Sequence, residues 1–274
     1  MKGMYRYLTP MLILAGAAAC SDDNTGTSGT GTVVVRLTDA PSDDLESAVI
    51  YISEVSVKGS DVSTNEQIIS STKASFDLLT LQNGVTATLG SATVPTGTYS
   101  QVRLLVDSAR VVLKSGHTFA DGSTTAKLTV PSGSQTGIKV NFSPPITVTE
   151  GQTVLVVDFD VSQSFVFQGP RDHPNSVSFK PVLHATALDV AASVSGTVTP
   201  VTANATVYAI AGTDTAGTAF PNATTGAYTI QFLAPGTYVV AAKATGFAVA
   251  VSASFTLANS EVKTGVNLVL VPAP

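Results

Sequence analysis

Residues 32–44 read Thr-Val-Val-Val-Arg-Leu-Thr-Asp-Ala-Pro-Ser-Asp-Asp, and they predict where the folded part of the chain begins. Val33, Val35 and Leu37 alternate with other residues and so share one face of an extended chain, which is typical of a half-buried β-strand. Pro41 ends this strand because proline cannot donate a hydrogen bond to a strand ladder. The stretch therefore predicts a first strand followed by an acidic turn.

The composition of the 274-residue chain predicts an all-β fold with more than one domain. Hydrophobic residues make up 44% and charged residues only 12% of the chain, and 22 glycines and 14 prolines supply frequent turns. Valine and threonine are abundant, and β-branched residues favour strands over helices. The net charge of -5, without a basic cluster, argues against a nucleic-acid partner.

The first residues predict a secretory signal peptide over residues 1–19. Lys2 and Arg6 precede an apolar run over 8–19, which is shorter than the roughly 20 residues that span a bilayer. The small residues 17–19 and Cys20 then resemble the lipoprotein box of bacteria. This resemblance implies that Cys20 receives a diacylglycerol thioether and becomes the first mature residue.

The alternative is an ordinary signal peptide cut before Cys20, with the cysteine incidental. Cys20 is the single cysteine of the chain, so no disulfide can form within it. Ser21 after the cysteine resembles the sorting signal for the outer membrane. Because the chain is acidic, we expect membrane attachment to rest on the acyl chains, and residues 20–31 to form the lipidated cysteine and a flexible polar tether.

Residues 32–188 predict a first β-sandwich, because short alternating segments recur at intervals of roughly 8–12 residues. The alternation changes phase near Ser53-Glu54, which predicts a β-bulge, and residues 59–75 look like a polar loop. Four motifs resemble a family of bacterial lipoprotein domains of unknown function, family 4382. They are Leu37–Pro41 followed by Asp43-Asp44, Val94–Tyr99, Val157–Val161 and Phe179–Leu183.

Residues 192–272 predict a second β-sandwich. The segment Val194–Val198 and the turn-and-strand pattern Leu233–Ala242 resemble the carboxypeptidase regulatory-like module, a small transthyretin-like sandwich. The resemblance implies an accessory domain grouped with carbohydrate-binding-like folds. Pro235-Gly236 offers the tight turn that the pattern needs.

The acidic turn holds the candidate metal ligands. Asp39, Asp43 and Asp44 could supply oxygens to calcium, which takes about six to eight of them. The interpretation that we favour is structural: Asp43 would cap a helical turn, with Glu46 three places on completing a capping box. On this interpretation the protein has no metal and no cofactor.

The remaining polar candidates do not form a catalytic motif. Asp158 and Asp160 share one face of a predicted strand, and we expect that face to meet solvent because Val157 and Phe159 mark the core side. His117, His173 and His184 lack zinc-binding spacing and are interpreted as solvated or strand-face side chains.

These observations favour a lipid-anchored, non-enzymatic structural or binding module of the bacterial envelope, with a glycan or an envelope protein as partner. The alternative is a carbohydrate-binding protein that uses the second sandwich. A hydrolase is the weakest of the three hypotheses, because the sequence holds neither a nucleophile elbow nor a metal motif.

Overall fold

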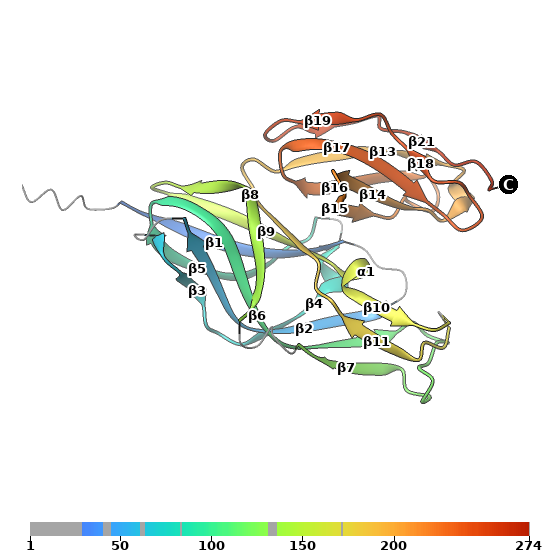
Figure 1. Cartoon of the computed structure of the whole chain (residues 1–274), viewed down its shortest axis with the longest axis horizontal. Coiled ribbons are helices and arrows are strands. Elements are labelled where there is room, and N and C mark those ends of the chain that lie inside the picture. The colour runs from blue at the N-terminus through green and yellow to red at the C-terminus, as the bar shows by residue number, and fades with distance from the viewer. Residues whose placement is uncertain are drawn as a thin grey trace, which may run out of the picture.

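The computed structural model describes residues 29–40, 45–60, 64–82, 84–130, 136–170 and 172–273. Strands dominate the described residues and surround two separate hydrophobic cores, so the all-β prediction is confirmed. The first core runs from Val33 to Ala187 and the second from Ala192 to Leu270. We call the parts around them the first and the second domain (Figure 1). The predicted signal peptide and Cys20 lie outside the described residues.

The first sheet of the first domain has its central strand where the chain enters the fold. Its order is β12 (Leu183–Ala187), β9 (Gln152–Asp160), β1 (Thr30–Ala40) and β5 (Ala87–Pro95). β1 runs parallel to β9 and antiparallel to β5. It begins two positions before the predicted strand, so Thr30 and Gly31 belong to the sheet and not to the tether. We call this the β1 sheet.

The facing sheet, the β6 sheet, is built on two long strands. β2 (Leu45–Gly59) pairs with β6 (Gly97–Leu113), and these carry β3 (Gln67–Ser70), β4 (Ala74–Asp77), β7 (Thr125–Thr129) and β8 (Ile138–Val148) along their sides. The inward side chains of both sheets fill the first core. The loop predicted over 59–75 is wrong in part, because β3 lies within it and β4 begins there.

Short elements close the ends of the first domain. A 3-10 helix, η2 (Leu78–Leu81), follows β4, and the side chain of Asp77 caps it by accepting a hydrogen bond from the Leu79 amide. The helical turn α1 (Val161–Ser164) follows β9 directly and leads into the hairpin β10 (Phe165–Gln168) and β11 (Ser176–Phe179). Of the helices that the structure describes, none is long and apolar enough to cross a membrane.

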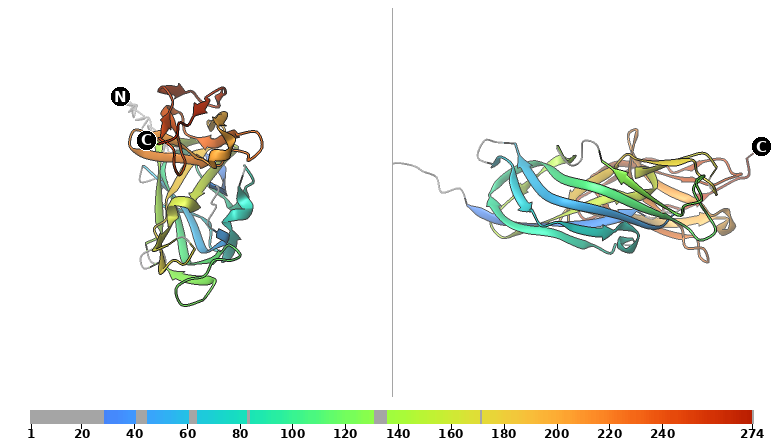
Figure 2. Two further views of the ribbon diagram at one scale, coloured as in Figure 1. Left: turned by 90° about the vertical axis from the view of Figure 1, so that its right-hand side faces the viewer. Right: turned by 90° about the horizontal axis from the view of Figure 1, so that it is seen from below.

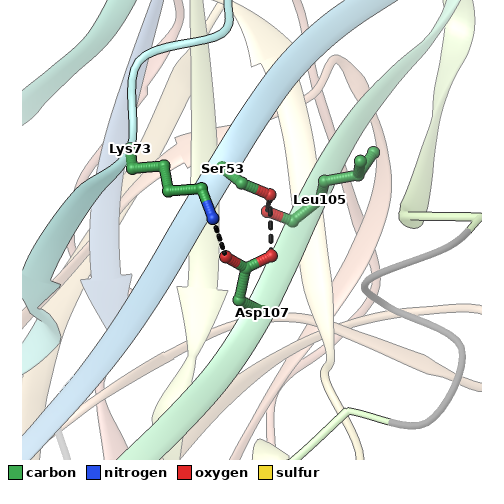
Figure 3. Close-up of polar contacts among 4 residues, drawn as sticks. All are labelled: Ser53, Lys73, Leu105 and Asp107. Carbon is green, nitrogen blue, oxygen red and sulfur yellow. Dashed lines mark hydrogen bonds and ion pairs between the residues drawn. The ribbon is translucent and has the colours of Figure 1, made fainter.

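The predicted β-bulge near Ser53 is confirmed. The register between β2 and β6 shifts between Ile52 and Glu54. Figure 3 shows how polar side chains hold this irregular point: the Ser53 hydroxyl donates to Oδ1 of Asp107 at 2.8 Å, and Lys73 Nζ lies 3.3 Å from Oδ2. These contacts lower the pKa of Asp107, the serine hydrogen bond being the largest cause and Lys73 a smaller one.

The second domain is a smaller sandwich. One sheet has the order β15 (Asp214–Ala219), β14 (Thr206–Ala211), β17 (Gly236–Lys243) and β18 (Ala250–Val251), with β19 (Phe255–Leu257) also beside β17. The other contains β16 (Ala227–Leu233) and β13 (Ala192–Thr199), and β13 pairs in parallel with β20 (Val262–Lys263) and β21 (Leu268–Val269). The 3-10 turn η3 (Val201–Ala203) follows β13.

Each domain contains the same tyrosine contact after a glycine turn. Tyr99 donates its hydroxyl proton to the carbonyl of Pro95 at 2.9 Å, and Tyr238 donates to the carbonyl of Ala234 at 2.7 Å. Both rings are buried. Each tyrosine therefore ties the start of its strand to the turn that precedes it.

The second domain lies on the outer face of the β1 sheet, beside the first domain (Figures 1 and 2). β15 contacts β1 and β9, and β16 contacts β12. Val34, Val156 and Thr186 are buried although they lie on the face away from the first core. The central strands of this sheet are therefore buried on both faces, as is typical of parallel strands.

Candidate functional site

Three buried carboxyl groups, those of Asp39, Asp158 and Asp160, lie near the ends of β1 and β9 on the two faces of the sheet. The parallel register sets Thr38 beside Asp158, Asp39 beside Phe159 and Ala40 beside Asp160. Asp39 is therefore on the core face of the sheet, and Asp158 and Asp160 are on the outer face. Asp39 is 4%, Asp158 9% and Asp160 1% exposed. The prediction that Asp158 and Asp160 face solvent is wrong. They do share a face, and Phe159 does point into the core, but the second domain covers the face that they share.

Asp160 accepts four hydrogen bonds and joins the two domains. As the N-cap of α1 it accepts from the Gln163 amide at 3.0 Å, and it also accepts from the side chains of Ser162 at 2.6 Å and Gln163 at 2.7 Å. The fourth donor is the hydroxyl of Thr218 on β15, at 2.9 Å. Because Asp160 accepts from all four donors, they favour the ionised carboxylate form of its side chain. Its oxygens have little capacity left to bind a cation.

The carboxyl group of Asp158, unlike that of Asp160, lies in an environment where it accepts no hydrogen bond from the described residues, although the side chain is buried. Burial, followed by the charge of Asp160, raises its pKa to about 7. Its buried position beside Asp160 therefore favours the protonated form.

His184 lies on β12 opposite Asp158, in the register of the antiparallel pair. Its Nε2 atom is buried without a hydrogen-bond partner among the described residues. Burial lowers the pKa of the ring, while Asp160, the backbone of Thr215 and Asp214 act in the other direction. The strand-face interpretation of His184 is thus confirmed, but the ring faces the second domain.

Asp39 is the one residue of the predicted acidic turn whose side chain the structure describes. Its Oδ1 accepts a hydrogen bond from the Val161 amide at 3.2 Å, and its Oδ2 is buried without a partner among the described residues. Burial, followed by the charge of Asp158, raises the pKa of Asp39 well above its usual range. The carboxyl group therefore serves the first turn of α1, which is distant in sequence, and not the turn after Pro41.

The remaining predictions for the acidic turn concern Asp43 and Asp44 as calcium ligands and Glu46 as part of a capping box. Asp43 and Asp44 lie outside the described residues. Glu46 lies in strand β2, so the predicted capping box is wrong. Within the described ranges, no group of three or more His, Cys, Asp or Glu side chains is placed to hold a metal ion.

His117 and His173 lie away from this junction. His117 follows a turn, and its Nε2 lies 3.9 Å from a carboxylate oxygen of Asp172. His173 is an exposed loop residue. Neither contributes to the cluster around Asp158.

The sequence alone did not identify Thr218 as part of this site. Two apolar runs did indicate that the strands that β15 contacts are buried on both faces. Residues 33–35 and 154–157 are uninterrupted apolar runs, which predict strands buried on both faces. Those runs indicated that a partner layer covers the outer face of the β1 sheet. Nothing in the local pattern of β15, which reads Asp-Thr-Ala-Gly-Thr-Ala, identified it as that layer.

The junction also has a groove. Phe142, Pro144 and Ile146 of β8, Ala185 of β12 and Pro235 of the second domain line a cavity of about 270 Å³. The residues that line this cavity do not include Asp158, Asp160 or His184. The titratable cluster therefore lies beneath the domain contact and outside this cavity.

These features define an all-β protein in which two sandwiches are joined through a buried polar contact. The first sandwich matches the family model described as Domain of unknown function (DUF4382) over residues 30–181, and the chain belongs to that family. No curated protein matches the sequence.

Solved structures give distant matches. The Bacillus anthracis TIE protein has 10% identity and a TM-score of 0.23, and the match covers 88% of this chain and 34% of that one, so this chain spans about a third of its length. The shaft pilin of Lactobacillus rhamnosus GG has 10% identity, a TM-score of 0.22 and coverages of 90% and 99%. A putative adhesin from Bacteroides ovatus has 8% identity, a TM-score of 0.22 and coverages of 97% and 99%.

Proposed function

We propose that this protein is a non-enzymatic structural or binding module of the bacterial cell envelope, held at the outer membrane by a lipid on Cys20. In this proposal the second domain is an accessory sandwich of the carboxypeptidase regulatory-like kind. The carrying observation is the position of Asp158, whose pKa is raised and which lies buried on the face of the β1 sheet that the second domain covers. Catalytic acids and bases have shifted pKa values too, but they must reach a substrate.

The arrangement of partners supports the same conclusion. Asp160, the neighbour that would complete an acid/base pair with Asp158, is already occupied by donors from α1 and by Thr218. The shifted pKa of Asp158 follows from the layer that covers it and from the charge beside it. We therefore assign the cluster to joining the domains and not to turnover.

The absence of turnover is tested with the purified protein on chromogenic esters, glycosides and phosphomonoesters. We expect rates equal to those of buffer for the wild type and for Asp158→Asn. Hydrolysis by the wild type that is lost in Asp158→Asn, while the circular dichroism spectrum is unchanged, would contradict the proposal.

The anchor is tested by Cys20→Ser in the natural host or a Gram-negative host. We expect the wild type in the detergent phase of a phase-separation experiment and the variant in the aqueous phase, because one or two acyl chains supply the attachment. Ser21→Ala is the control, since it keeps the acceptor cysteine. Recovery of Cys20→Ser in the detergent phase would refute attachment through this residue.

The carbohydrate-binding alternative has less support from the aromatic residues. Tyr228 and Tyr238 of the second domain are 3% and 4% exposed, and their hydroxyls donate to the carbonyls of Val266 and Ala234. Stacking on a sugar needs an exposed ring face, which the half-buried Tyr208 offers better. We expect a glycan array to give no signal. A signal that Tyr208→Ala abolishes would place the alternative first.

A further inference from the structure

The domain junction contains a pair of titratable residues that has no role in capping α1. Asp158 and His184 are direct neighbours across β9 and β12, so their side chains lie on the same face of the β1 sheet. The second domain covers that face through β15, and the Thr215 backbone lies close to the ring of His184. Asp158 is buried and His184 is half-buried, with its Nε2 atom buried, so opening of this contact would expose both side chains further to water.

We propose that Asp158 and His184 form a proton-exchanging latch at the domain junction. When the second domain closes over the pair, a proton leaves the imidazolium ring of His184 and binds the carboxylate of Asp158, so that two neutral groups are buried. When the second domain moves away, the proton returns to the ring and both groups are charged in water. This latch is independent of the envelope function proposed above.

The physical basis is the cost of burying charge. Removing an ion pair from water is unfavourable unless hydrogen bonds replace the lost hydration. Asp158 receives no such bond among the described residues, and His184 Nε2 has none either. A neutral acid beside a neutral imidazole avoids this cost when the junction closes.

The pair has charged neighbours, and the nearest in effect is Asp160, whose charge favours a charged His184 and disfavours a charged Asp158. Asp160 is engaged with four donors, and Asp39 is engaged with α1. α1 itself offers only uncharged donors, Ser162 and Gln163. The remaining ones are Arg36, half-buried on the same face of β1 with no ion pair to Asp158 among the described residues, and Asp214 on β15, which favours a charged His184.

The two groups respond to pH with opposite signs. Burial, with the charge of Asp160, raises the pKa of Asp158 from 3.8 to about 7, so closure takes up a proton there and is favoured as pH falls below 7. Burial lowers the pKa of His184 from 6.5, so closure releases a proton there and is disfavoured as pH falls below 6.5. Over the pH interval in which both effects act, they cancel, and the wild-type junction is nearly independent of pH.

Single substitutions should therefore reveal opposite pH dependences. In Asp158→Asn only the ring titrates, and the closed population should fall as pH drops below 6.5, by up to about tenfold per pH unit. In His184→Asn only the carboxyl group titrates, and the closed population should fall as pH rises towards 7, again by up to about tenfold per unit. Just below pH 6.5, where both groups respond, the wild type should change less with pH than either single variant.

The readout is the distance between two dyes, one on each domain. Cys20→Ser removes the single native cysteine, and Lys127→Cys and Ser254→Cys place labels on exposed residues of the two domains. Asp107→Asn is the matched control, because this carboxyl group lies on β6 and its pKa is lowered, so it does not titrate in this interval. The double variant Asp158→Asn with His184→Asn should be independent of pH.

Three results would overturn the latch. The first is a pH response of the same sign in both single variants. The second is a pH-independent junction in both single variants when each still folds. The third is a constant, closed distance in every variant between about pH 5 and 8. Opposite signs in the two single variants, with a flat double variant, would establish it.

Discussion

Thr218 donates its hydroxyl proton to Oδ2 of Asp160 at 2.9 Å, although 58 residues separate them in the chain and they lie on strands of different domains, β15 and β9. The same carboxylate caps α1. One side chain therefore links the end of β9, the helical turn that follows it and the edge strand β15 of the second domain.

Thr218→Val should weaken the junction. The change removes one hydrogen bond to a buried carboxylate while it keeps the shape of the side chain, and we expect a loss of about 1–2 kcal/mol in the free energy of unfolding. Urea denaturation followed by circular dichroism measures it. Thr213→Val is the control, because that threonine is exposed and should change stability by less than about 0.5 kcal/mol. Equal effects of the two substitutions would argue against the role of Thr218.

Asp39→Asn should be tolerated near neutral pH and Asp39→Ala should not. Burial raises the pKa of Asp39, so the wild type loses stability as pH rises through that raised value, and the asparagine variant should not. Alanine leaves the Val161 amide without its acceptor, at a cost of about 1–3 kcal/mol. Unfolding free energies measured in steps of pH from about 4 upwards test this. A steeper loss at high pH in Asp39→Asn than in the wild type would contradict it.

Calcium should leave the protein unchanged. Asp39 is committed to α1, so the acidic turn keeps fewer of the six to eight oxygens that calcium needs. Melting curves in millimolar calcium and in chelator should coincide. A rise of the melting temperature with calcium that is absent in Asp43→Asn would make metal binding the leading interpretation.

Asp107 should contribute to stability mainly above its lowered pKa. Ser53 and then Lys73 favour its charged form, so this contribution is present above pH 3.8 and is lost as pH falls through the lowered value. The pair with Lys73 is exposed, so Asp107→Asn should cost less than about 1 kcal/mol at pH 7. Acid titrations of the two proteins should converge at low pH. Parallel curves down to the acid limit would rule out the contribution.

Loss of either buried tyrosine hydroxyl should destabilise its own domain. Tyr99→Phe and Tyr238→Phe each remove a hydrogen bond to a turn carbonyl, which we expect to cost about 0.5–1.5 kcal/mol. Tyr208→Phe is the control, since that ring is only half-buried. Hydrogen exchange resolved by peptide should show faster exchange around residues 94–99 in the first variant and 233–238 in the second. Faster exchange spread over both domains would mean that the two cores unfold together.

The strands could be predicted from sequence where their alternation is regular and local. Val33, Val35 and Leu37 gave β1 its inward face, and the broken alternation near Ser53 located the bulge. Proline and glycine at 95 and 97 placed the turn between β5 and β6. β15 could not be predicted in this way, because its small polar residues acquire their environment from contact with β1 and β9.

The layer that buries Asp158 and the partner of Asp39 could not be predicted from any local sequence pattern. Alternation correctly put Asp158 and Phe159 on opposite faces, but it could not say what covers the outer face. The covering layer comes from residues 214–219, which are distant in the sequence. The helical turn that uses Asp39 is equally remote, since its Val161 amide lies 122 residues further on.

The position of β1 has a consequence for how the fold bears mechanical load. β1 is paired on both sides, with β5 over Thr30–Leu37 and with β9 over Thr32–Ala40. A pull on the chain ahead of Thr30 acts along the strand and loads both ladders in shear, so their hydrogen bonds share the force. An edge strand pulled sideways would instead lose its hydrogen bonds one after another. A force applied through the lipid that we propose for Cys20 would therefore be borne by the β5 and β9 ladders together.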